Sequence, residues 1–110
     1  MDWEKIYYFK PSEFTNPDKI DEAALLKLDQ ARSIAGVPFV ITSSYRDDPD
    51  SSHSKGNAFD IRCHNSMSRY FMLEALFRVG FTRIGVYDCH IHADTDTERD
   101  EYVVWVDLSR

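Results

Sequence analysis

The stretch from Ser51 to Asp60, Ser-Ser-His-Ser-Lys-Gly-Asn-Ala-Phe-Asp, constrains the fold of this chain more than any other feature. It places His53 and Asp60 on either side of Gly56, and glycine allows the tight reversal that turns both side chains toward one point. Imidazole nitrogen and carboxylate oxygen are ligands that zinc accepts readily. The stretch therefore indicates half of a zinc site, and the fold must bring a further ligand to it.

A second polar cluster, His90-Ile91-His92-Ala93-Asp94, follows later in the chain. We expect a strand here, and the alternation of side chains along a strand points Asp88, His90, His92 and Asp94 toward one face. A face this polar is unusual for a strand in a small domain, and it can supply the missing ligand. Two histidines and one carboxylate leave a coordination position of zinc open, which is typical of a catalytic site.

Length and charge exclude several classes of protein. With 110 residues, the chain has room for one core, so we expect a single domain over 1–110. A net charge of −6 without a Lys/Arg run argues against nucleic-acid binding, and no apolar stretch is long enough for a membrane span. The first residues lack the pattern of a secretion signal, which predicts synthesis in the cytoplasm. We expect a monomer whose Cys63 and Cys89 are reduced.

The periodicity of apolar residues predicts an α+β fold, a small and mostly antiparallel sheet packed by two helices. An aromatic-rich arm over 1–17 is expected to lie over the core, and a polar loop is expected over 44–55. Pro17-Asp18 is expected to open the first helix and Ser66 to cap the second, with Gly36 and Gly80 after their ends. The predicted helices cover 18–35 and 66–79, and the predicted strands cover 39–43, 58–63, 83–87, 90–94 and 103–107.

Other conspicuous residues are expected to be structural. The acidic run from Asp94 to Glu101 is typical of an exposed hairpin, and the aspartates of 47–50 of a solvated loop. Trp105 is expected in the core or in the wall of a cleft. We expect the same structural role, as cover for the core, for the aromatic residues of the N-terminal arm: Trp3, Tyr7, Tyr8 and Phe9.

Taken together, these motifs resemble the zinc D-Ala-D-Ala carboxypeptidase family, which includes phage endolysins and vancomycin-resistance dipeptidases and shares its core with the Hedgehog signalling domain. The resemblance runs through most of the chain. It is carried by three segments: Ile41-Thr42-Ser43-Ser44-Tyr45-Arg46, the stretch Ser51 to Asp60, and Gly85-Val86-Tyr87 leading to His90-Ile91-His92-Ala93-Asp94.

The resemblance implies a Hedgehog-like fold that binds one Zn²⁺ per chain through His53, Asp60 and His92. It implies that Arg46 holds a carboxylate or carbonyl of the substrate, which suits the paired hydrogen bonds of a guanidinium. Ser51 would orient the substrate. The implied reaction is hydrolysis of an amide bond in peptidoglycan stem peptides, by a carboxypeptidase or endopeptidase of the D,D or L,D type.

The general base is the position at which the chain departs from the family. Many members carry Glu or Asp three residues before the last zinc histidine, where this chain has Cys89. A thiol is a poor substitute for a carboxylate that takes a proton from water. Asp88 is the first candidate for this role. Asp94 is the second, although it can instead brace an imidazole, and His90 resembles a histidine that donates to the developing oxyanion.

Three classes of function agree with these patterns. The first is a zinc peptidase acting on the cell wall, as a phage endolysin that leaves the cytoplasm through a separately made pore or as a bacterial remodelling enzyme. The second is a zinc-binding module without catalysis, as in Hedgehog. The third is a phage structural component, such as a tail protein, that has the same fold.

Overall fold

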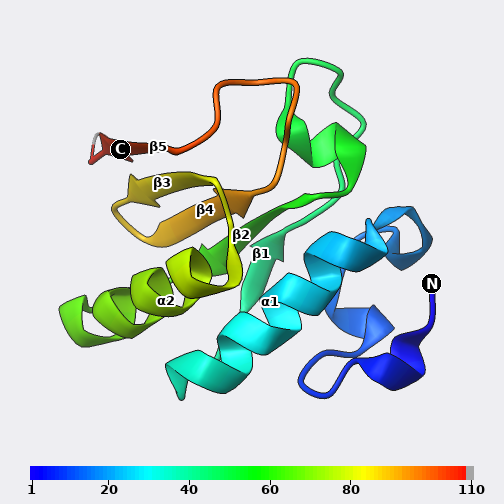
Figure 1. Cartoon of the computed structure of the whole chain (residues 1–110), viewed down its shortest axis with the longest axis horizontal. Helices are drawn as coiled ribbons and strands as arrows, with labels where there is room; N and C mark the ends of the chain where they lie inside the picture. The colour runs from blue at the N-terminus through cyan, green and yellow to red at the C-terminus, as the bar shows by residue number, and fades with distance from the viewer. Residues whose placement is uncertain (109–110) are drawn as a thin grey trace.

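A five-stranded mixed sheet forms the centre of the fold, and two helices pack on one of its faces. The computed structural model describes residues 1–108. Figure 1 shows both helices on the same side of the sheet and beside each other. Along the chain the elements are α1 (Glu22–Ala35), β1 (Ile41–Ser43), β2 (Ala58–Arg62), α2 (Ser66–Val79), β3 (Arg83–Tyr87), β4 (His90–Asp94) and β5 (Val103–Asp107).

The strand order β1-β2-β4-β3-β5 is antiparallel except between β3 and β5, which run parallel. Asp60 lies opposite His92, His92 opposite Gly85, and Gly85 opposite Trp105. Residues that lie opposite one another in paired strands share a face of the sheet. A row of four positions therefore crosses the sheet from β2 to β5 on one face.

The alternate residues of the same strands form the core on the other face. Phe59 and Ile61 of β2 are fully buried there, as are Ile84 of β3 and Ile91 of β4. Burying each such side chain contributes about 1.5–3 kcal/mol relative to leaving it in water. The helices cover these residues with Leu25, Leu28, Ala31, Ala75 and Leu76. Among residues 1–108, no helix has the length and apolar character required to cross a membrane.

The strands predicted at 83–87, 90–94 and 103–107 are confirmed residue for residue, and the second helix is confirmed with its end at Val79. The first helix begins later than predicted. Pro17–Lys19 is a separate 3₁₀ turn, Ile20 is extended, and α1 starts at Glu22. The side chain of Asp21 caps α1 by accepting from Ala24 N. Its own N–H donates to the carbonyl of Gly56, a tertiary contact that the local sequence does not reveal.

The structure also differs from the predicted bounds in smaller ways. Asn65, not Ser66, caps α2, because its side chain accepts from Ser68 N at 2.8 Å. The first strand is confined to Ile41–Ser43, and the second ends at Arg62. The polar loop predicted over 44–55 contains a 3₁₀ helix, η4 (Ser52–Lys55).

The N-terminal arm lies over the core as predicted, although not through every aromatic residue. Phe9 and Phe14 are buried, whereas Tyr7 is 88% exposed. The N–H groups of Tyr7 and Tyr8 donate to the carboxylate of Asp29 in α1 at 3.0 and 2.8 Å. The buried Asp29 therefore anchors the arm to the first helix.

Gly56 joins η4 to the start of α1. It adopts the left-handed conformation (φ +74°), and its carbonyl accepts from Asp21 N at 2.8 Å. A Cβ at this position would lie 2.1 Å from the carbonyl oxygen of Lys19. Glycine is therefore required here both for the backbone angle and for the close approach of the two segments.

We predict that Gly56→Ala destabilises the protein by clearly more than the roughly 1–2 kcal/mol that a left-handed alanine costs by itself. Gly36→Ala is the matched control, because Gly36 has a similar φ of +69° but no atom within 4 Å of a Cβ. The free energies of unfolding, measured in urea, give the comparison. Equal losses for the two variants would contradict the packing role of Gly56.

Candidate metal centre

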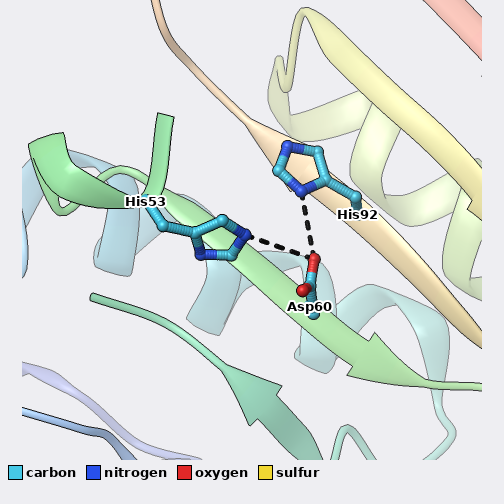
Figure 2. Close-up of side chains that lie close together, drawn as sticks. All are labelled: His53, Asp60 and His92. Carbon is cyan, nitrogen blue, oxygen red and sulfur yellow. Dashed lines mark hydrogen bonds and ion pairs between the residues drawn. The ribbon is translucent and has the colours of Figure 1, made fainter. Parts of the chain in front are cut away.

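Three elements bring the predicted ligands His53, Asp60 and His92 together (Figure 2). His53 belongs to η4, Asp60 lies in the middle of β2, and His92 lies in the middle of β4. One ligand atom from each of these side chains lies within 4.8 Å of the other two. The group can therefore hold a metal ion.

The distances within the group suit a small divalent ion. His92 Nδ1 lies 3.0 Å and His53 Nε2 lies 3.5 Å from the same atom, Asp60 Oδ1. Ligand atoms bound about 2 Å from a tetrahedral ion lie roughly 3.3 Å from one another. Both histidines therefore approach the carboxylate at the separation that shared coordination requires.

The environment of His53 fixes which of its nitrogens faces the group. Its Nδ1 lies 2.5 Å from the carbonyl oxygen of Ser44, which can only accept, so the proton belongs on Nδ1. In the neutral imidazole, Nε2 then carries a lone pair. This atom is buried and makes no hydrogen bond with any of residues 1–108. A buried acceptor without a donor is unfavourable unless a cation occupies the position in front of it.

Asp94 orients the second imidazole. Its carboxylate lies 2.6 Å from His92 Nε2, which leaves Nδ1 directed at Asp60. Asp94 is fully buried and is itself held by Arg83 Nε at 3.1 Å and by the N–H of Asp96 at 3.0 Å. Of the two roles that the sequence leaves open for Asp94, these contacts match the bracing of an imidazole.

The electrostatics of the group favour opposite charges. Burial by itself raises the pKa of Asp60, but the imidazoles of His53 and His92 outweigh it and hold this pKa below its ordinary range. Burial lowers the pKa of His92, and the hydrogen bonds to Asp60 and Asp94 outweigh that effect and raise it. The surroundings thus favour an ionised Asp60 beside a positive charge. A protonated imidazole or a bound metal ion can supply that charge.

Asp96 connects the loop that carries His53 to the segment that follows β4. Its carboxylate accepts from Ser52 Oγ at 2.9 Å and from Glu98 N at 3.0 Å, and it pairs with Lys55 at 2.9 Å and Arg99 at 3.2 Å. The acidic run from 94 to 101 was predicted to be exposed, and for Asp94 and Asp96 this is wrong. Both side chains are buried because cations and backbone donors surround them.

A cavity of about 390 Å³ opens above the ligands, and we call it the site cavity. Predicted residues Arg46, Ser51 and His90 line it, as do Tyr87 and Trp105. Arg46 is exposed, and its guanidinium makes no hydrogen bond or ion pair with residues 1–108. Ser51 caps η4 by accepting from His53 N at 3.2 Å. The site cavity thus combines the guanidinium of Arg46 with the three candidate ligands His53, Asp60 and His92, which we call the metal group.

Trp105 forms one wall of the site cavity, one of the two places expected for it. Its ring lies against Gly85, where a Cβ would come within 2.6 Å of the indole. The ring centroid is 5.4 Å from that of His92. The absence of a side chain at Gly85 therefore lets the indole pack directly against β3, close to His92.

Asp88, the first candidate for the general base, lies in the turn between β3 and β4 and is exposed. It is not among the described residues that line the site cavity. Cys89 occupies the same turn with an exposed thiol, and Cys63 is buried; both are free. The turn therefore places Asp88 and Cys89 outside the lining of the site cavity.

Comparison with known proteins adds no family to these observations. No protein-family model matches the chain. A comparison with curated proteins also finds no match. The function of the site must therefore be argued from its geometry and from the motifs that compose it.

We predict that the protein binds one Zn²⁺ and that His92→Ala weakens this binding by roughly 100-fold or more, since even residues that only orient ligands contribute 10–100-fold. Isothermal titration calorimetry with zinc measures both. His64→Ala is the control, because His64 is an exposed histidine in the segment that follows β2. Unchanged affinity in His92→Ala would remove this residue from the ligand set.

We also predict that Asp96→Asn destabilises the protein at neutral pH by about 1.5–3 kcal/mol, the range for hydrogen bonds to a charged group. Burial alone raises the pKa of Asp96, but hydrogen bonds from Lys55, Glu98 N and Ser52 lower it from 3.8 to about 2. A folded-state pKa below the unfolded one stabilises the fold above the unfolded value. This stabilisation is lost as the pH falls toward 2.

Urea unfolding of the wild type and of Asp96→Asn across this range is the measurement. The difference in free energy of unfolding should be constant near neutral pH and narrow below about pH 4. Asp47→Asn, at an exposed loop position, should give no comparable difference at any pH. A gap between wild type and Asp96→Asn that persists at the acid end would show that charge is not its cause.

Proposed function

We propose that this protein is a zinc-dependent peptidase that hydrolyses an amide bond in peptidoglycan stem peptides. One observation carries the proposal. The buried Nε2 of His53, which makes no hydrogen bond with residues 1–108, lies near Asp60 and His92 in the lining of the site cavity. Three ligands of the N, N, O type would leave one position of a tetrahedral zinc ion open, as in catalytic sites.

Zinc bound there would polarise the scissile carbonyl and make water a stronger nucleophile near neutral pH. In the overall reaction, the oxygen of water bonds to the carbonyl carbon and the C–N bond breaks. The amine leaves with a proton, and the other product is a carboxylate. A zinc ion held by the metal group would therefore promote amide hydrolysis. The choice of substrate would depend on the residues around the metal group.

Arg46 is the residue that we assign to the substrate. Its N–H donates to the carbonyl of His53, so the backbone holds it beside a ligand, while the guanidinium remains available. A guanidinium binds a carboxylate through two parallel hydrogen bonds. Peptide substrates with a terminal or side-chain carboxylate near the scissile bond suit this arrangement. Stem peptides carry such groups, and the resemblance to the D-Ala-D-Ala carboxypeptidases and endolysins points to the same class.

The proposal is tested by incubating the zinc-loaded protein with purified peptidoglycan and identifying the products by mass spectrometry. We expect new amino groups and a mass change that assigns the broken bond, and we expect a chelator to abolish both. Asp60→Asn keeps the size of the side chain but removes a charged ligand, so it should be inactive. Zinc binding by the wild type without any cleavage of walls or of short stem peptides would refute the peptidase.

Metal-dependent binding without hydrolysis is the second candidate, and a specific observation favours it. Asp88 lies outside the site cavity, and Asp94 is engaged with His92, Arg83 and the N–H of Asp96. Neither carboxylate is placed to take a proton from water in the cavity. In this case, zinc would increase the affinity of the protein for stem peptides, as a pull-down on peptidoglycan measures, and no products would form.

A further inference from the structure

We propose that the hydroxyl group of Tyr87 donates a hydrogen bond to the carbonyl oxygen of the substrate as negative charge develops on it. This inference rests on the proposed function, since it assigns a catalytic residue to the same reaction. Tyr87 is the last residue of β3 and lines the site cavity. It lies two positions from Gly85, so it shares the face of the sheet that carries the metal group.

The polarity of one hydrogen bond determines what Tyr87 can do. The indole N–H of Trp105 can only donate, and it lies 2.8 Å from the oxygen of Tyr87. The phenol oxygen is therefore the acceptor in this bond, and its own proton must point elsewhere. None of residues 1–108 accepts that proton. Within the described part of the chain, a donor without an acceptor thus remains at the wall of a cavity that contains the metal ligands.

The position of the hydroxyl is fixed before any substrate binds. The ring of Tyr87 stacks on the imidazole of His90, with centroids 4.3 Å apart and planes 8° from parallel. Trp105 is held in turn by its contact with Gly85 and by the guanidinium of Arg83, 5.3 Å from the ring. A donor fixed in this way needs no reorganisation as the charge develops, which is the condition for effective stabilisation of an oxyanion.

The pairing with His90 suggests how the substrate carbonyl would lie. His90 and Tyr87 are adjacent on the same wall of the site cavity, and the resemblance noted above implies that His90 donates to the oxyanion. Both are on the face of the sheet that carries His92. A substrate carbonyl oxygen that points toward this wall would therefore lie near the hydroxyl of Tyr87, on the same face of the sheet as the metal group.

Tyr87→Phe tests the inference, because it removes the hydroxyl and keeps the stacked ring. In the zinc-loaded full chain, acting on the stem peptide that the wild type cleaves, we expect kcat to fall by about 100-fold, the lower end for loss of an oxyanion donor. KM and zinc content should not change. Tyr102→Phe is the matched control, since Tyr102 is 87% exposed and lies outside the site cavity.

Trp105→Phe provides a second, independent variant. It removes the N–H that holds the hydroxyl of Tyr87, so it should lower kcat less than Tyr87→Phe does. If the N–H of Trp105 acts only by holding the hydroxyl of Tyr87, the double variant should be no slower than Tyr87→Phe. A kcat for Tyr87→Phe within twofold of the wild type, at equal zinc content, would overturn the inference while leaving the peptidase intact. A wild type without turnover would instead overturn the proposed function, and the inference with it.

Discussion

The pairing register between β2 and β4 is the constraint on which the metal group depends. Asp60 lies opposite His92, while Phe59 and Ile61 on either side of Asp60 are buried under the helices. Because side chains alternate along a strand, a slip of one residue would turn the carboxylate into the core and the apolar side chains toward the cavity. Hydrophobic burial on one face of the sheet therefore fixes the ligands on the other.

Buried polar contacts orient the ligand side chains that the strand register brings together. The carbonyl of Ser44 sets the tautomer of His53, and the carboxylate of Asp94 sets the orientation of His92. Asp96 joins the segments that follow β4 and precede β2 through Ser52 and Lys55. Such contacts orient ligands before an ion arrives, so ion binding need not order the loops. The loop that carries His53 is thus connected to the strands that carry Asp60 and His92 by contacts that need no ion.

The sequence was sufficient for features that depend on local pattern. Alternation identified β4, and the residue types around Gly56 identified the group that the structure assembles. The sequence was insufficient for features that depend on contacts between segments far apart in the chain. The start of α1 depends on Asp21 donating to Gly56, and nothing local distinguishes the buried Asp96 from its exposed neighbours. Tyr87 was overlooked as a site residue because its partner, Trp105, reaches it only through the parallel pairing of β3 with β5.

The place of Trp105 has a spectroscopic consequence. The chain contains two tryptophans, and the other, Trp3, packs against Phe14 in the N-terminal arm. An ion held by His53, Asp60 and His92 would sit beside the indole of Trp105, whose ring centroid is 5.4 Å from that of His92. Ions with unfilled d shells, such as Cu²⁺ and Co²⁺, quench a fluorophore at such short range, whereas Zn²⁺ does not. The molecule therefore contains its own optical reporter of which metal occupies the site, with Trp3 as an internal reference.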